Sequence, residues 1–419
     1  MSKLRGFLGG AVASAIAAGA LGWAPGPASA ATAGPVTDPI GVMVIPRGAP
    51  IVIGAYWVLS GPDTALGEDE KRGAEIAIKD MGGRLMGHPV VLDAQDDQCN
   101  AEGGQTAATK LASTPNVVIV IGPACSSAAT PGAPILWQAG LTNIGTACTA
   151  PALTAADRKP EYDGFVRTVF SDVDQGASDA NYLAKVKGFK TAVTVHDGSP
   201  YAQQLVTVMA KDFEQDGGKV LSREAVAPTD VDMHPVLTRI ASEKPDVIYM
   251  PIFTAAAAQL LRQSKETSGL EHTDLFGGSS LLSADFIEAA GPAVVGFEMG
   301  YPDLSPAVMG KGYPQFVEKY KKDYGEGPTS GYHANAYDGA VLALKAIQSV
   351  AKDDNGTLYI GKKALRDAVF ATKFDGMSGP ISCDKYGECS QFHGSVLQYV
   401  SADPKTFGIG KNPIKVWPK

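Results

Sequence analysis

The side chains with the clearest potential for ligand chemistry follow two short apolar segments in the first half of the chain. Val117–Ile121 is an unbroken apolar run typical of a buried parallel strand, and Ser126 and Ser127 come where the next helix is expected to begin. A second strand near residues 141–144 leads into the loop 145–149. Both loops are expected at the carboxyl edge of one sheet, where open α/β sheets bind ligands.

The chemistry offered by these loops is that of an anion site. Serine hydroxyls beside the free N–H groups of a first helical turn attract a small anion, most simply a carboxylate. The alternative is that Ser126 only caps its helix.

Catalytic and metal-binding patterns are weak in this sequence. Residues 196–199 (HDGS) contain the three side-chain types of a hydrolase, but their adjacency in one loop cannot place base and nucleophile in a relay. No G-x-S-x-G elbow, phosphate-binding loop or C-x-x-C pair occurs, and the six histidines are scattered. We therefore predict that the protein is not an enzyme and that it uses no cofactor or metal.

The first 30 residues have the pattern of a secretory signal peptide. Lys3 and Arg5 precede an uncharged apolar stretch, and Ala28-Ser29-Ala30 matches a small-residue cleavage site. The first cysteine is Cys99, so no lipid-attachment cysteine follows the expected cleavage near Ala30. We expect an exported protein that is not lipid-anchored.

Length and charge limit the remaining classes. About 390 residues follow the leader, which is too many for one core and favours two domains. The net charge of −8 becomes −10 without the leader, and no basic run occurs, so we predict no nucleic-acid partner. No later stretch has the roughly 18 apolar residues of a transmembrane helix.

Cysteine pairing stays open at the level of the residues alone. Cys383 and Cys389 flank a turn-forming insert and could close a hairpin, which an exported protein can retain. Cys99 and Cys125 follow neighbouring predicted strands, so a bridge between them is plausible and would leave Cys148 unpaired.

Strands and helices are predicted to alternate twice along the chain. Residues 31–50 are rich in Pro, Gly and Ala and are expected to form an irregular arm. Strands are predicted at 51–57, 89–92, 117–121, 141–144, 165–170, 191–196, 220–225, 246–250 and 275–276, with helices at 68–81, 101–112, 174–186, 201–215, 235–242 and 255–268. Three long helices (313–324, 334–351 and 363–372) and a strand-rich tail (381–400) follow. This pattern predicts an α/β fold of two doubly wound lobes with a ligand in the cleft between them.

An ordered set of short motifs resembles the periplasmic solute-binding proteins of the branched-chain amino acid type, which serve ABC importers. The matching segments are LSGP (59–62), RGAEIAI (72–78), DDQC (96–99), GPACSS (122–127), TAPALT (149–154), DQG (174–176), VHDGSPY (195–201), LLRQ (260–263) and SGPISCD (378–384). Each segment is short, but together they keep the family's order and approximate spacing from about residue 50 to 400.

The resemblance implies the type I periplasmic binding protein fold, with two lobes that a three-strand hinge joins and that close on the ligand. It implies a first lobe at 48–170 and 301–378 and a second at 171–300 and 379–419, preceded by an arm at 31–47. It also implies a Cys99–Cys125 disulfide and an ABC permease in the inner membrane as partner. The alternative is a periplasmic sensor subunit acting on a membrane receptor.

The resemblance also assigns roles to single residues. Ser126 and Thr149 match the positions that hold the ligand carboxylate, and the carbonyl of Ala147 matches an acceptor for a ligand ammonium. Tyr201 and Phe253 match cleft aromatics of the second lobe. The alternative for both aromatic residues is a core position.

One departure from the family pattern bears on the ligand. The family places an acid at a strand end of the second lobe, where this chain has Ser279 within FGGSS (276–280). A buried ammonium without a counter-charge is costly, which favours a carboxylate ligand that lacks an α-ammonium, such as an aromatic, hydroxy or keto acid. Asp303 or Asp285 could replace the missing acid, and Trp57 is a weak further candidate for the pocket wall.

Overall fold

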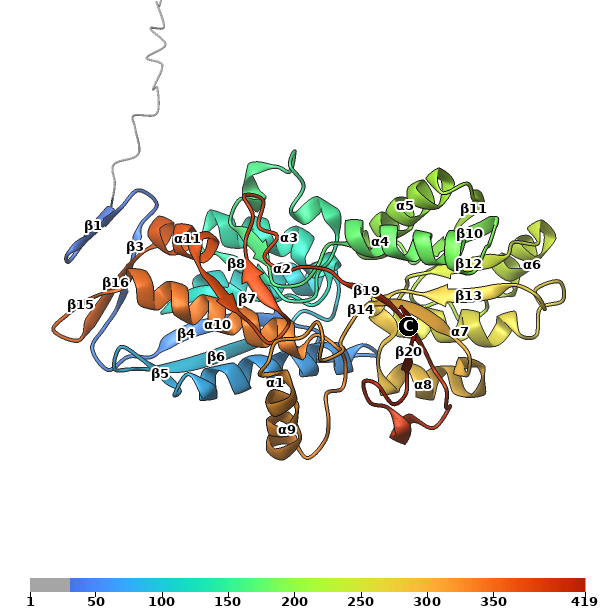
Figure 1. Ribbon diagram of the computed structural model, residues 1–419. Coiled ribbons are helices and arrows are strands. Elements are labelled where there is room, and N and C mark those ends of the chain that lie inside the picture. The colour runs from blue at the N-terminus through green and yellow to red at the C-terminus, as the bar shows by residue number, and fades with distance from the viewer. Residues whose placement is uncertain (1–30, 419) are drawn as a thin grey trace, which may run out of the picture.

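A computed structural model describes residues 31–418 and shows two α/β lobes side by side (Figure 1). The predicted signal peptide lies outside the described residues. Within the described part of the chain, no helix combines the length and hydropathy needed to cross a membrane. The predicted fold class, two doubly wound lobes, is confirmed by the sheet order given below.

The first lobe is built on a six-stranded sheet in the order β5-β6-β4-β7-β8-β9. Every neighbouring pair is parallel except β5 with β6. The strands are β4 (Ile51–Trp57), β5 (Arg84–Leu85), β6 (His88–Asp96), β7 (Val117–Ile121), β8 (Asn143–Gly145) and β9 (Phe165–Arg167). All residues of β4 and β7 are buried, as expected for central strands with helices on both faces.

Helices from two distant parts of the chain cover this sheet. They are α1 (Thr64–Asp80), α2 (Ala101–Ser113), α3 (Ser126–Gln138), α9 (Tyr313–Tyr324), α10 (His333–Val350) and α11 (Lys362–Ala371). The α1 and α10 helices pack closely because Gly73 has no side chain: a Cβ there would lie 2.1 Å from the carbonyl oxygen of His333. The chain therefore returns to the first lobe after it has built the second.

The second lobe repeats the strand order of the first. Its sheet runs β11-β10-β12-β13-β14-β19-β20, parallel as far as β14 and antiparallel beyond it. The strands are β10 (Thr191–His196), β11 (Lys219–Ala225), β12 (Val247–Met250), β13 (Asp274–Gly277), β14 (Glu298–Pro302), β19 (Gly394–Gln398) and β20 (Ile414–Trp417). In both lobes the first five strands in chain order, leaving β5 aside, lie 2-1-3-4-5, which places a topological switch point beside the first strand.

The helices of the second lobe follow its strands. They are α4 (Asp172–Asn181), α5 (Pro200–Gln215), α6 (His234–Glu243), α7 (Thr254–Ser264) and α8 (Ala284–Ala290). The sequence predicted one helix over 174–186. The structure instead has α4 followed by a π-helical turn at Tyr182–Val186.

Three chain segments cross between the lobes, after β9, after β14 and before β19 (Figure 1). The segment 379–389, which the sequence placed in the second lobe, lies against the first. Here β18 (Pro380–Ser382) pairs with β17 (Lys373–Asp375), and the Arg167 N–H donates to the Gly387 carbonyl at 2.8 Å. Conversely, Tyr301 and Pro302, which it placed in the first lobe, lie in β14 of the second sheet.

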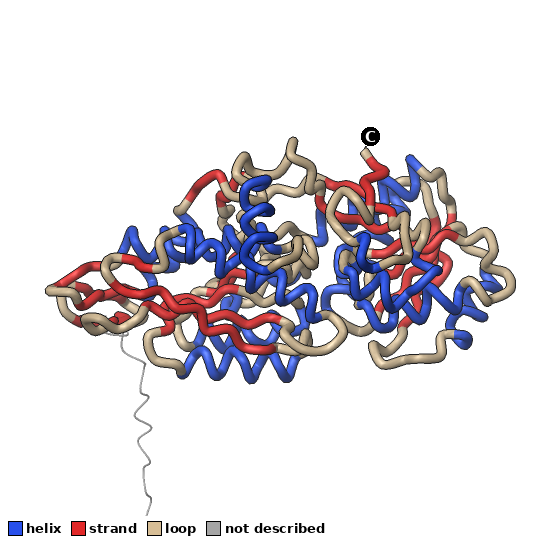
Figure 2. The backbone as a smooth tube through the Cα atoms, turned by 90° about the horizontal axis from the view of Figure 1, so that it is seen from below, coloured by secondary structure: helices blue, strands red, loops and turns tan. Residues whose placement is uncertain are grey.

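The arm at 31–47 is more regular than the sequence predicted (Figure 2). It forms β1 (Ala31–Ala33), β2 (Val36–Asp38) and β3 (Val42–Ile45). The β3 strand joins a small sheet with β16 (Thr357–Gly361) and β15 (Lys352–Asp354). Asp38 accepts hydrogen bonds from the first-turn N–H groups of Lys363 and Ala364, so the arm also caps α11.

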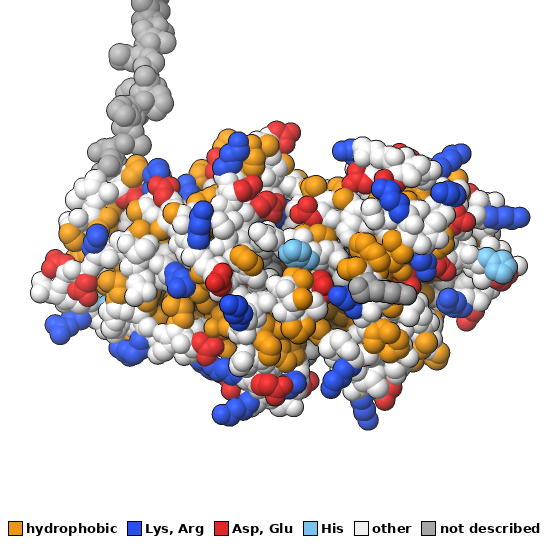
Figure 3. Space-filling view, viewed as in Figure 1, with side chains coloured by type: hydrophobic (Ala, Val, Ile, Leu, Met, Phe, Trp, Pro, Cys, Tyr) orange, Lys and Arg blue, Asp and Glu red, His pale blue; other side chains and the backbone are white. Residues whose placement is uncertain are grey.

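The molecular surface carries both signs of charge. On the face shown in Figure 3, Lys and Arg side chains are interspersed with Asp and Glu over both lobes. Tyr56, Trp57, Arg167 and Tyr249 are among the largest fully buried side chains. Trp57 therefore belongs to the core, where its indole N–H donates to the Thr146 hydroxyl at 3.1 Å, and it does not line the pocket described next.

Candidate functional site

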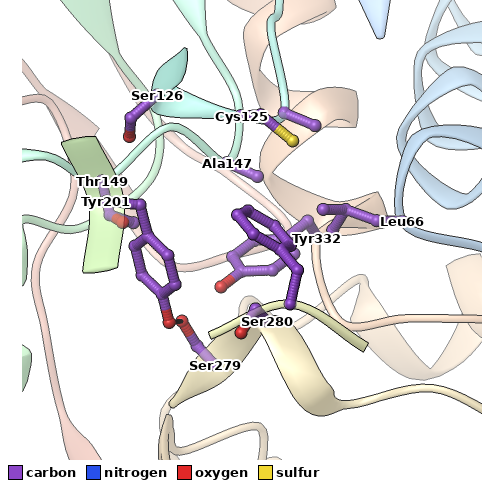
Figure 4. A pocket seen from close by; sticks show the side chains of 11 residues that line it. Leu66, Cys125, Ser126, Ala147, Thr149, Tyr201, Ser279, Ser280 and Tyr332 are labelled. Carbon is purple, nitrogen blue, oxygen red and sulfur yellow. Dashed lines mark hydrogen bonds between the residues drawn. The ribbon is translucent and has the colours of Figure 1, made fainter. Parts of the chain in front are cut away.

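A pocket lies between the two lobes, where the carboxyl edges of their sheets face each other (Figure 4). About 270 Å³ lies between its lining residues, a space that includes open solvent. The lining residues are Leu66, Ala124, Cys125, Ser126, Ala147, Thr149 and Tyr332 from the first lobe, with Tyr201, Phe253, Ser279 and Ser280 from the second. All six residues that the sequence singled out for ligand binding are thus brought together at one place.

The start of α3 forms one end of this pocket. Cys125 is the N-cap and Ser126 the first helical residue, so Ser126 does not cap its own helix. Its hydroxyl oxygen instead accepts the Ala150 N–H at 3.1 Å, which leaves the hydroxyl hydrogen to donate. Within residues 31–418 the N–H groups of Ser126 and Ser127 have no acceptor. This arrangement presents donors and the positive end of a helix dipole to an anion.

The disulfide between Cys99 and Cys125 fixes this helix start to the loop after β6. The Ser127 hydroxyl reinforces the connection by donating to the Cys99 carbonyl at 2.6 Å. The structure contains the second disulfide as well, between Cys383 and Cys389, and leaves Cys148 buried and unpaired. Burial raises the pKa of the Cys148 thiol, so it stays protonated at neutral pH.

The loop after β8 contributes Ala147 and Thr149 and is held from behind by Arg167. The fully buried guanidinium donates to the carbonyls of Cys148 and Ala150 at 3.2 and 3.0 Å and to the Thr154 hydroxyl at 2.8 Å. Glu388, inside the Cys383–Cys389 loop, pairs with the same guanidinium, its Oε2 at 2.9 Å from Nε. The backbone that carries Thr149 is therefore fixed by a buried guanidinium, which pairs with the partly exposed Glu388 carboxylate.

Aromatic rings form the wall contributed by the second lobe. Tyr201 lies in the first turn of α5 and Phe253 is the N-cap residue of α7, and their ring centroids are 5.6 Å apart. Asp197 accepts the Phe253 N–H at 3.2 Å and the Ser199 N–H at 3.0 Å. The 196–199 loop thus helps to position these rings.

Hydroxyl groups form the opposite end of the pocket from Ser126 (Figure 4). Ser279 and Ser280 follow β13, and the Tyr201 and Ser279 hydroxyls are 3.5 Å apart. The Ser280 hydroxyl donates to the Ile252 carbonyl at 2.9 Å. Gly278 is required here because a Cβ at this position would lie 2.4 Å from the Tyr201 hydroxyl oxygen.

Tyr332 and Leu66 are pocket residues that the sequence analysis missed. Tyr332 precedes α10, more than 130 residues after Tyr201, and its N–H donates to the buried Asp69 carboxylate at 3.1 Å. Leu66 lies in the first turn of α1. An aromatic directly before a predicted helix was the available signal for Tyr332, but nothing local indicated that this helix start faces the cleft.

No carboxylate lines the pocket within residues 31–418. Asp303, a suggested replacement for the missing acid, accepts from the Lys415 ammonium at 3.1 Å and from the Ser305 N–H, and Asp285 is not a lining residue. Asp172 is a buried acid behind this wall, beside the Thr149 hydroxyl. Burial raises its pKa to about 7 although Thr149 and Arg167 oppose that shift.

Two doubly wound lobes with a pocket between their facing carboxyl edges define a class of protein that encloses a small molecule in a cleft. A family model described as periplasmic binding protein matches residues 50–391. The Leu/Ile/Val/Thr-binding protein of Salmonella typhimurium is 28% identical over 355 residues, covering 83% of this chain and 91% of that protein.

Two solved structures share the fold. A leucine-binding protein of Thermotoga maritima has a TM-score of 0.74 and 24% identity, covering 84% of this chain and 96% of its own. A solute-binding protein of an ABC transporter from R. palustris, in complex with benzoate, has a TM-score of 0.71 and 22% identity, covering 88% and 95%. The chain belongs to the periplasmic binding protein family. The resemblance inferred from the motifs is confirmed, and the family is one of binding proteins, as the prediction of a non-enzyme requires.

Proposed function

We propose that the protein captures a small carboxylate ligand between its lobes in the periplasm and delivers it to an ABC-type permease. The observation that carries this proposal is the start of α3, where Ser126 lines a pocket formed by both lobes and the N–H groups of Ser126 and Ser127 have no acceptor within residues 31–418. Ser126 and Thr149 hold the carboxylate, and Tyr201 and Phe253 cover the ligand body. Contacts from both lobes are needed because a ligand shifts a conformational equilibrium only by its differential affinity.

The preferred ligand lacks an α-ammonium. The carbonyl of Ala147 accepts no hydrogen bond within residues 31–418 and is the single ammonium acceptor that the family pattern supplies here. Asp172 is a weak counter-charge, because a carboxyl with a pKa near 7 is about half protonated at neutral pH. The similarity to a Leu/Ile/Val/Thr-binding protein favours the competing interpretation, an amino acid.

Calorimetric titration with leucine and with its keto acid separates these ligands. Tighter binding of the keto acid is expected, and binding of leucine alone would contradict the preference. Ser126→Ala is expected to weaken binding of either ligand by about 1–3 kcal/mol, because a charged acceptor loses a donor. Ser127→Ala is the matched control, since its hydroxyl donates to Cys99 and does not line the pocket. Equal affinity of the Ser126 variant and the native protein would refute the carboxylate site.

Delivery is tested separately from capture. Ligand uptake into vesicles that contain the cognate permease, driven by ATP, is expected to depend on the loaded protein. Ligand binding without any stimulation of uptake would favour the alternative role as a sensor subunit.

A further inference from the structure

We propose that the end of the pocket opposite Ser126 is a hydroxyl-recognition subsite, formed by Tyr201, Tyr332 and Ser279, that selects carboxylates with a hydroxyl at their far end. This inference rests on the proposed function, because it assumes that the carboxylate lies at Ser126. The subsite provides a second, uncharged set of contacts for the ligand, which restricts the carboxylates that bind.

Three hydroxyl groups converge at this end from both lobes. The Tyr201 and Ser279 oxygens belong to the second lobe, while Tyr332 reaches them from the start of α10 in the first. In Figure 4 the two tyrosine hydroxyls point toward the Ser279 and Ser280 side of the pocket, away from Ser126. A ligand group placed there contacts both lobes at once.

These hydroxyls are buried and short of partners. Tyr201, Tyr332 and Ser279 are 5, 3 and 2% exposed. Within residues 31–418 their only hydrogen bond of acceptable geometry is the one between Tyr201 and Ser279, at the long distance of 3.5 Å. All three residues line the pocket, so the hydrogen-bonding capacity that their hydroxyls do not use in the protein is available to a ligand group placed there.

The partner must be neutral and must both donate and accept. No charged side chain lines the pocket within the described residues, so a second ligand charge would be buried without compensation. Tyrosine and serine hydroxyls donate and accept, and a ligand hydroxyl matches both functions. A purely apolar end would leave these groups unsatisfied.

Calorimetry with matched ligand pairs tests the subsite, on protein freed of co-purified ligand. The pairs are benzoate with 4-hydroxybenzoate, phenylalanine with tyrosine, and hexanoate with 6-hydroxyhexanoate. In the pair that fits the cleft, the hydroxylated member is expected to bind about ten-fold tighter. Ser279→Ala and Tyr201→Phe are expected to reduce that ratio toward one, with thermal melts verifying that both variants fold.

Two control variants separate this subsite from the carboxylate site. Ser126→Ala is expected to weaken both members of a pair equally and to keep their ratio. Ser127→Ala is also expected to keep it, because this hydroxyl donates to the Cys99 carbonyl and does not line the pocket. Equal binding within every pair, or a ratio that survives Ser279→Ala and Tyr201→Phe, would overturn the subsite and leave the proposed function standing.

Failure of the proposed function has a different signature. In that case no carboxylate binds, and native mass spectrometry finds no small acid in the purified protein. A co-purified acid also tests the subsite directly. An acid with a hydroxyl remote from its carboxylate supports it, and an acid with a purely hydrocarbon far end refutes it.

Discussion

The two lobes have the same strand order but use equivalent positions differently. The third strand of each sheet leads into a helix whose start lies at the cleft, α3 in the first lobe and α7 in the second. The start of α3 is open to the pocket. The start of α7 is occupied, because Asp63 of the first lobe accepts the Thr254 N–H at 3.2 Å.

The loops after the fourth strands differ in the same way. The loop after β8 is fixed by the buried Arg167 side chain, which Glu388 pairs with from a partly exposed position. The loop after β13, in contrast, contains small residues with hydroxyls and no charge. The first lobe therefore offers a fixed wall with free N–H donors at the start of α3, and the second offers a wall of rings and hydroxyls. A shared topology thus places loops at the cleft, and the local side chains decide which loop receives the charged end of a ligand.

Replacement of Arg167, which holds the pocket loop of the first lobe, is expected to have the largest effect on stability. Arg167→Met leaves Glu388 without its partner and frees the Cys148 and Ala150 carbonyls, which should lower the free energy of unfolding by about 3–5 kcal/mol. Urea denaturation measures this loss. The Arg239–Glu224 pair of the second lobe is the control because its guanidinium is exposed, and Arg239→Met should cost less than about 1 kcal/mol. Equal losses in both variants would show that Arg167 contributes no more to stability than an exposed arginine does.

The disulfides provide a second test of the rigid wall. Cys99 and Cys125 close a 26-residue span next to Ser126, and their double replacement by serine should cost about 2–4 kcal/mol and weaken ligand binding. Cys383 and Cys389 are only six positions apart, so the same replacement should cost less. Unfolding and ligand titration of both double variants measure the two effects. Unchanged affinity without the Cys99–Cys125 bridge would show that it does not position the α3 start.

Much of the fold follows from local patterns in the sequence. The predicted helix 313–324 coincides with α9. The helix is amphipathic, and Gly325 ends it in a left-handed conformation at φ +78°. The arm strand β3 was missed because its partner, β16, lies more than 300 residues later. The local pair of β1 and β2 was missed because each strand has only 3 residues, too few to show a periodic pattern.

The site was predicted unevenly. Ser126, Ala147 and Thr149 follow strand ends, so topology alone brings them to one edge of a sheet. Tyr201, Phe253 and Ser279 were placed by resemblance to a family. Tyr332 could not be found by either route, because its position depends on the Asp69 carboxylate and on the return of the chain to the first lobe.

The titration of Asp172, which lies behind Thr149 in the first lobe, is expected to make the stability of the protein depend on pH. Its carboxyl has a pKa of about 7 in the folded protein and an ordinary value near 4 when unfolded. Between these values the folded state binds a proton that the unfolded state has released, so stability falls as pH rises, by at most about 1.4 kcal/mol per pH unit. Asp172→Asn removes this dependence.

Urea denaturation of both proteins at pH 5 and pH 8 measures this effect. The native protein should lose stability relative to Asp172→Asn between the two values. Parallel behaviour of the two proteins would mean that Asp172 does not titrate in this range.

The smallest effect is expected at the contact between the lobes. Asp63→Ala removes the acceptor that caps α7 across the cleft, which should weaken ligand binding by about 0.5–1.5 kcal/mol, because the cap helps hold the lobes together. Asp63→Asn keeps an acceptor and should lose less. Calorimetry gives the affinities, and small-angle scattering of the ligand-free variants should show a larger radius of gyration for Asp63→Ala. If the radius of gyration and the affinity are both unchanged, the Asp63 contact at the start of α7 does not contribute to closure of the lobes. The difference between the lobes in ligand binding then rests on the open start of α3 alone.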